Sequence, residues 1–117
     1  MNVYLVVIVA VLVLYKVYSM KNSLKKEDVK QMLKNGGKII DVRTPMEFKN
    51  GHVKNAKNIE YSNIVKGVKK AKISKDTPII LYCASGSRSS VACSTLKSSG
   101  YTNVHNGGTA SKLNRVL

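Results

Sequence analysis

The sequence predicts a small α/β domain with a mostly parallel sheet. From residue 24 onward, short apolar segments typical of buried strands alternate with segments of helical periodicity. The chain has 117 residues, which leaves room for one domain with a single core once the apolar first 20 residues are set aside. Ligands of such sheets bind beyond the carboxyl ends of the strands, so a functional site is expected there.

The first 20 residues are predicted to form an uncleaved transmembrane anchor. From Val3 to Tyr15 the chain carries no charge, and a helix over residues 1–20 would cross a hydrocarbon core of roughly 30 Å if the Lys16 side chain extends to the interface. Lysines follow this segment and none precede it, which predicts a single-pass membrane protein whose residues 21–117 face the cytoplasm. A cleaved signal peptide and a buried or surface helix are the alternatives, although a basic start and a small-residue cleavage pattern are missing.

The rest of the chain divides into strands and helices whose ends are marked by glycine and proline. Gly36-Gly37 and Gly100 end two helices, Pro45 begins another, and Gly107-Gly108 are predicted to turn the chain. The predicted elements, in order, are a helix at 24–35, a strand at 38–43, a brief helix at 45–48, a strand at 56–59, a helix at 61–71, a strand at 78–83, a helix at 87–99, a strand at 104–106 and a helix at 110–117.

One cysteine stands at the junction of a predicted strand and a predicted helix. The apolar segment 78–82 leads into Cys83, a short Ser/Gly loop follows, and Arg88 lies where the next helix begins. A thiol at such a junction lies beside unpaired backbone N–H groups and the positive end of the helix dipole, which favours its thiolate and allows an attached anion to be bound. Cys83 is therefore predicted to be a nucleophile rather than a small buried strand residue.

Three sequence patterns occur in order over residues 24–109. The first is Asp-Val-Arg-Thr-Pro-Met-Glu-Phe at 41–48, followed by Gly-His-Val at 51–53, Ala56 and Asn58-Ile59. The second is Cys-x-x-Gly-x-Arg at 83–88, and the third runs from Leu96 through Gly100-Tyr101 and Asn103-Val104 to Gly107-Gly108. The three patterns occur in this order and fall on predicted strands, loops and helices. Together they make the chain resemble the rhodanese (single-domain sulfurtransferase) family. It departs from the family pattern at Glu60, where proline is frequent, and after Gly108, where an aromatic residue is frequent.

The resemblance implies a rhodanese-like fold with about five parallel strands flanked by helices, and Cys83 as the sulfur carrier. It also implies that Asp41 and Arg43 support the site. The anion would be held by Arg88 and the loop amides, that is, by Ala84, Ser85, Gly86, Ser87 and Arg88.

The length of the loop favours sulfur over phosphate chemistry. Four residues separate Cys83 from Arg88, one fewer than in the related phosphatases and arsenate reductases, and the shorter ring of amides fits a persulfide better than a transferring phosphoryl group. The predicted enzyme is a thiosulfate sulfurtransferase. Cys83 attacks the outer sulfur of a small anionic donor such as thiosulfate or of a persulfide, and the sulfur then passes to cyanide or to a thiol, small or on a thioredoxin-like protein. No metal and no organic cofactor is expected.

Two other functions remain open. The chain could be a non-enzymatic, membrane-anchored persulfide carrier or protein-docking module, or a redox switch that uses Cys83 and Cys93. Core packing is the favoured interpretation of Cys93, and a structural charge network that of Asp41 with Arg43. The two histidines, His52 and His105, fit turn or core positions, and helix capping is enough to explain Ser87 or Ser89.

The formal net charge of +14 biases the surface toward anions of any kind. The 17 lysines are scattered along the chain without interleaved aromatic residues, which argues against nucleic-acid binding and favours a solvated lysine-rich surface. The two cysteines do not form the framework of a disulfide-rich domain, so a reducing compartment is expected.

Overall fold

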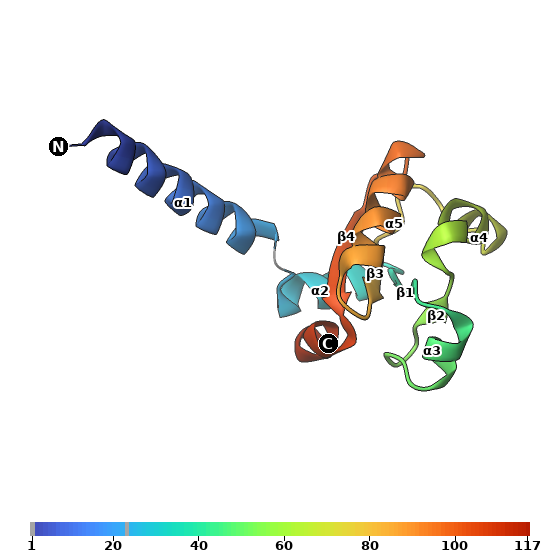
Figure 1. Ribbon diagram of the computed structural model, residues 1–117. Helices are drawn as coiled ribbons and strands as arrows, with labels where there is room; N and C mark the ends of the chain where they lie inside the picture. The colour runs from blue at the N-terminus through green and yellow to red at the C-terminus, as the bar shows by residue number, and fades with distance from the viewer. Residues whose placement is uncertain (1, 23) are drawn as a thin grey trace.

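The computed structural model describes residues 2–22 and 24–117, with the backbone alone at 18–22. Strands and helices alternate along the chain after the first helix (Figure 1). The elements are α1 (Val3–Asn22), α2 (Lys26–Lys34), β1 (Lys38–Asp41), α3 (Pro45–Lys49), β2 (Lys57–Asn58), the 3-10 turn η1 (Tyr61–Asn63), α4 (Ile64–Lys70), β3 (Ile79–Cys83), α5 (Ser87–Ser98), β4 (Val104–Thr109) and α6 (Ala110–Val116).

The strands form one parallel sheet in the order β2-β1-β3-β4. The predicted α/β class with a parallel sheet is therefore confirmed. The sheet has four strands within the described residues, so the expectation of five is wrong. The reason is that the sequence itself predicts four strand segments, at 38–43, 56–59, 78–83 and 104–106, whereas the fifth strand was implied only by the resemblance.

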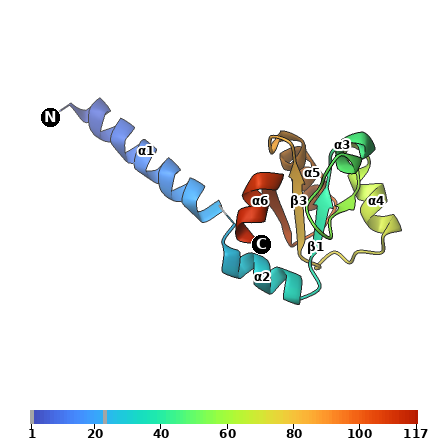
Figure 2. The same ribbon diagram turned by 90° about the horizontal axis from the view of Figure 1, so that it is seen from below.

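Helices cover both faces of the sheet, as Figure 2 shows. Because successive side chains of a strand point to opposite faces, β3 contributes to two separate cores. Ile79, Leu81 and Cys83 pack with residues of α4 and α5, whereas Ile80 and Tyr82 pack with residues of α2 and α6. All five β3 residues are buried, which explains the uninterrupted apolar run that predicted this strand.

The last strand is longer than the sequence predicts, because it includes Gly107 and Gly108. Its pairing with β3 shifts register between Leu81 and Tyr82, so Tyr82 lies opposite Gly108. A Cβ on Gly107 would come within 3.0 Å of Ile80 Cγ2, and Gly108 has a φ of +78°. The predicted turn at these glycines is wrong because they permit close packing on β3 and a local bulge instead.

The first helix, α1, extends away from the α/β domain (Figure 1). Within the part of the chain that the structure describes, no helix is long and apolar enough to cross a membrane. The predicted membrane anchor at residues 1–20 is therefore not supported. The uncharged run ends before Lys16 and, from Val3 to Tyr15, covers only about 20 Å of helix.

Candidate active site

Cys83 is the last residue of β3, at the carboxyl edge of the sheet. The chain then turns through residues 84–86 and begins α5 at Ser87. The residue before the helix is Gly86, whose φ of +94° is in the left-handed region that favours glycine. Cys83 is fully buried while Ala84, Ser85 and Ser87 are exposed, so a buried sulfur lies next to an open loop.

The sulfur of Cys83 receives hydrogen bonds from the loop and the start of α5. The amide of Gly86 donates to Sγ at 2.9 Å and the amide of Ser89 at 3.5 Å, and the Ser89 hydroxyl lies 3.5 Å away. Burial by itself raises the pKa of the Cys83 thiol, but hydrogen bonds from Ser89, Ser85 and Gly86 outweigh it, so the pKa of Cys83 is lower than usual. These N–H groups stabilise a thiolate that is ready to act as a nucleophile.

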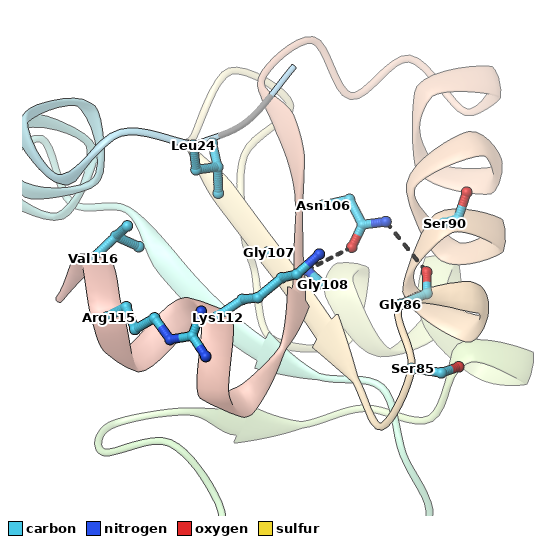
Figure 3. Close-up of a pocket in the computed structure, with 10 residues that line it drawn as sticks. All are labelled: Leu24, Ser85, Gly86, Ser90, Asn106, Gly107, Gly108, Lys112, Arg115 and Val116. Atoms are coloured by element: carbon cyan, nitrogen blue, oxygen red, sulfur yellow. Dashed lines mark hydrogen bonds between the residues drawn. The ribbon is translucent and has the colours of Figure 1, made fainter. Parts of the chain in front are cut away.

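Ser89 connects the Cys83 loop to the last strand. Its hydroxyl, which is buried, donates to Asn106 Oδ1 at 2.7 Å. Asn106 Oδ1 also accepts from the amide of Gly108 at 2.9 Å, and Asn106 Nδ2 donates to the carbonyl of Gly86 at 3.2 Å. The two bonds from the Asn106 side chain to Gly86 and Gly108 are visible in Figure 3. The side-chain oxygen and the side-chain nitrogen of Asn106 therefore both make hydrogen bonds that fix the position of the loop.

Sequence reasoning missed this role of Asn106 and misassigned Ser89. The N-cap residue of α5 is Gly86, which has no side chain to cap the helix, so the capping interpretation of Ser87 or Ser89 is wrong. The hydroxyl of Ser87 instead lies 2.9 Å from that of Ser85. One signal for Asn106 was available, because the strand predicted at 104–106 ends at this asparagine, which would bring it near the sheet edge where the cysteine lies.

Arg88, predicted to bind an anion, is held by Glu47. The guanidinium donates from Nη1 to Oε1 at 2.7 Å and from Nη2 to Oε2 at 2.9 Å, a bidentate arrangement. The hydrogen bonds between the two side chains are the largest cause of two pKa shifts. They lower the pKa of Glu47 to about 2 and raise the pKa of Arg88. The positive charge of Arg88 is therefore already balanced by a carboxylate.

Glu47 reaches Arg88 from the first turn of α3. Thr44 precedes this helix and forms a capping box, in which its hydroxyl accepts from the Glu47 amide at 3.3 Å and its own amide donates to Glu47 Oε1 at 3.2 Å. The cap orients the Glu47 carboxylate, which then joins α3 to α5. Sequence reasoning placed Glu47 in the first motif but did not assign it to the site.

Asp41 and Arg43 form a partly buried ion pair at the end of β1. Arg43 Nη2 lies 2.6 Å from Asp41 Oδ2, and Asp41 is fully buried. The same carboxylate accepts from the hydroxyl of Tyr82 at 2.8 Å, and that hydroxyl in turn accepts from the amide of Val53 at 2.9 Å. Burial raises the pKa of Tyr82 to about 12, so Tyr82 is a neutral donor. This network supports Tyr82, the residue directly before Cys83, and among the described hydrogen bonds it does not include the Cys83 sulfur.

Cys93 and the histidines lie outside this arrangement. Cys93 belongs to the core beneath α5, as predicted, and burial raises its pKa to about 11. Both cysteines are free thiols. His52 stacks on Phe48 with 3.7 Å between the ring centres, and His105 is hydrogen-bonded to Asn103 at 2.6 Å. Among the residues that the structure describes, no cluster of three or more metal-ligating side chains occurs.

The geometry fits covalent catalysis by a thiolate. A nucleophile of lowered pKa stands at the edge of the sheet, its charge is stabilised by backbone N–H groups, and the loop that carries it is fixed by Asn106 and by the Glu47–Arg88 pair. A group attached to Sγ would lie among the same N–H donors.

Comparison with known proteins gives consistent matches. Residues 25–109 match the model of the rhodanese-like domain family. The chain is 32% identical over 110 residues to the uncharacterized protein YqhL of Bacillus subtilis (strain 168), covering 90% of this chain and 86% of that one. It is 35% identical over 69 residues to the thiosulfate sulfurtransferase PspE of Escherichia coli (strain K12), covering 59% of this chain and 66% of that one. A solved structure described as rhodanese with anions from E. coli superposes with a TM-score of 0.62 at 32% identity, covering 65% of this chain and 89% of that one.

Proposed function

Because the chain belongs to the rhodanese-like domain family, we propose that it is a sulfurtransferase in which Cys83 carries the transferred sulfur. Sulfur transfer is the activity named for the E. coli relative. The observation that carries the proposal is the 2.9 Å hydrogen bond from the Gly86 amide to Cys83 Sγ, because such a bond stabilises a thiolate and remains available to a persulfide.

In the first step the Cys83 thiolate attacks the outer sulfur of a donor such as thiosulfate. A bond forms between Sγ and that sulfur, the S–S bond of thiosulfate breaks, and sulfite leaves with the electron pair. The product is a Cys83 persulfide. Its terminal sulfur is negatively charged and is stabilised by loop N–H groups near the start of α5.

In the second step an acceptor thiolate attacks the outer sulfur of the persulfide. The S–S bond of the persulfide breaks, the electron pair returns to Cys83 Sγ as a thiolate, and the acceptor leaves as a persulfide. Each step is a displacement at sulfur that neither gains nor loses electrons overall, so the proposed cycle uses no metal or organic cofactor. Two successive displacements give ping-pong kinetics. Free thiols are required throughout, which places the proposed activity in a reducing compartment.

The intact mass of the full chain before and after incubation with thiosulfate tests the proposal. The expected result is a gain of one sulfur atom that cyanide removes, that is absent from Cys83→Ser and that persists in Cys93→Ser. An unchanged mass with Cys83 still a free thiol would overturn it in favour of a protein-docking module. A loss of two hydrogens that requires both cysteines would overturn it in favour of a redox switch.

A further inference from the structure

A pocket of about 630 Å³ lies between the Cys83 loop and α6 (Figure 3). The loop contributes Ser85 and Gly86, so a molecule in this pocket touches the segment that directly follows the nucleophile Cys83. The other walls come from α5, β4, α6 and the residue Leu24 before α2.

Two cations of α6 line this pocket. Lys112 and Arg115 are three residues apart and therefore share one face of the helix. The Lys112 stem packs on β4, because a Cβ on Gly108 would lie 3.3 Å from Lys112 Cδ. Figure 3 shows the Lys112 side chain extending along the strand toward Asn106. No acidic residue is among the described residues that line the pocket, so its charge is positive.

The other two arginines of the chain are already paired. Arg43 is bound to Asp41 and Arg88 to Glu47, and these are the two ion pairs found in the described part of the chain. An anion at the Cys83 loop would have to displace a carboxylate to use either of them. The cations available next to the loop without such a displacement are those of α6.

The residues that line the pocket indicate an organic ligand. Thiosulfate is small and wholly polar, whereas this pocket has apolar side chains, Leu24 and Val116, beside its cations. A ligand with a carboxylate, a short carbon chain and a thiol fits the cations, the apolar side chains and the loop residues Ser85 and Gly86 that line this pocket.

We infer that this pocket binds the sulfur acceptor, a low-molecular-weight thiol whose carboxylate is held by Lys112 and Arg115. The inference rests on the proposed function, because it assigns an acceptor to the second displacement. The acceptor thiolate attacks the outer sulfur of the Cys83 persulfide, the persulfide S–S bond breaks, and Cys83 recovers its thiolate. Lys112 and Arg115 take no part in these bonds and determine which acceptor is preferred.

The test loads the full chain with thiosulfate and then measures the rate constant for discharge to three thiols of similar size. These are 3-mercaptopropionate, which is anionic, 2-mercaptoethanol, which is neutral, and cysteamine, which is cationic. The quantity compared is the ratio of the anionic to the neutral rate constant, since the intrinsic reactivity of each thiol cancels between variants. In the double variant Lys112→Met/Arg115→Met this ratio is expected to fall about tenfold. This is the combined effect of losing two exposed ion pairs with the carboxylate of the anionic thiol.

Matched variants separate charge from folding. Lys34→Met removes one lysine from the end of α2, beside the start of β1 and away from the Cys83 edge, and is expected to leave the ratio unchanged. The conservative variants Lys112→Arg and Arg115→Lys are expected to retain the ratio, and Arg115→Glu to shift preference toward cysteamine.

The outcomes distinguish the inference from the proposed function. If Cys83 gains sulfur and the double variant discharges to all three thiols with the wild-type ratios, the inference is wrong while the proposed function stands. A slower gain of sulfur from thiosulfate at an unchanged ratio would assign the two cations to the donor and overturn the acceptor role. If Cys83 gains no sulfur in the wild-type chain, the proposed function fails and the inference fails with it.

Discussion

At Cys83 two effects act on the thiol in opposite directions. Burial disfavours the charged thiolate, whereas hydrogen bonds from Ser89, Ser85 and Gly86 favour it, and the hydrogen bonds dominate. The Ser89 hydroxyl lies 3.5 Å from Cys83 Sγ and 2.7 Å from Asn106 Oδ1. The reactivity of the cysteine therefore depends on a residue that also holds the loop to β4.

Replacement of Ser89 by alanine is expected to raise the pKa of Cys83, because one hydrogen bond that lowers it is removed. Alkylation of Cys83 by iodoacetamide near neutral pH should become about threefold slower, the effect of losing about 0.7 kcal/mol of thiolate stabilisation. The pH profile of alkylation, followed by peptide mass spectrometry, checks this result. Ser94→Ala, an exposed change on the same helix, serves as the control, and equal profiles for Ser89→Ala and wild type would contradict the prediction.

At the scale of the elements, the Glu47–Arg88 pair joins α3 to α5 across 41 residues of sequence. The pKa of Glu47 in the folded chain, about 2, is below its ordinary value of 4.5. A lowered pKa means that the stability supplied by the pair is fully present above the ordinary value and is lost as the pH falls toward the folded value. Acid should therefore loosen the contact between the two helices.

Glu47→Gln is expected to unfold at a lower urea concentration than the wild type near neutral pH, because it removes the charge that Arg88 binds. The difference between the two midpoints should shrink as the pH is lowered from about 5 to about 2, where the wild-type carboxylate is itself protonated. Urea titrations at several pH values within this range measure it. A difference that stays constant with pH would show that the ion pair does not provide the stability.

Gly67 gives a second prediction for α4. In an exposed helix, alanine is about 1 kcal/mol more favourable than glycine. A Cβ on Gly67 would collide with Ile59 Cγ2, and overpacking a core costs about 1–3 kcal/mol. Gly67→Ala is therefore expected to destabilise the domain by up to about 2 kcal/mol in urea unfolding.

A double-mutant cycle checks the cause of that loss. In an Ile59→Ala background the colliding methyl group is absent, so Gly67→Ala should become neutral or stabilising. The same destabilisation in both backgrounds would locate the cause outside this contact.

For the molecule as a whole, the formal net charge of +14 acts on every charged reactant that approaches Cys83. The rate constant for sulfur loading by thiosulfate is expected to fall several-fold between about 20 mM and about 200 mM salt, because mobile ions screen the attraction. Alkylation by iodoacetamide, which is neutral, is the control and should change little. Equal salt dependence of the two reactions would show that the net charge does not guide the donor.

Much of the fold was predictable from patterns between residues close in sequence. The apolar runs at 38–43 and 78–83, the cysteine at a strand–helix junction and the glycine stop at Gly36-Gly37 are all local signals, and each corresponds to an element or boundary of the structure. The membrane anchor at residues 1–20 and the fifth strand are not found among the described residues. The first was inferred from the apolar character and length of the segment and from the lysines that follow it, and the second from resemblance without a segment to form it.

The sequence by itself determined the α/β class, the place of Cys83 at the carboxyl edge of the sheet and the core position of Cys93. Only the tertiary structure decided that Arg88 binds Glu47, that Asn106 holds the loop through Gly86, and that α6 brings Lys112 beside it. The physical reason is distance along the chain. Periodicity, turns and caps depend on neighbouring residues, whereas these contacts depend on the order of the strands and on which helices cover each face.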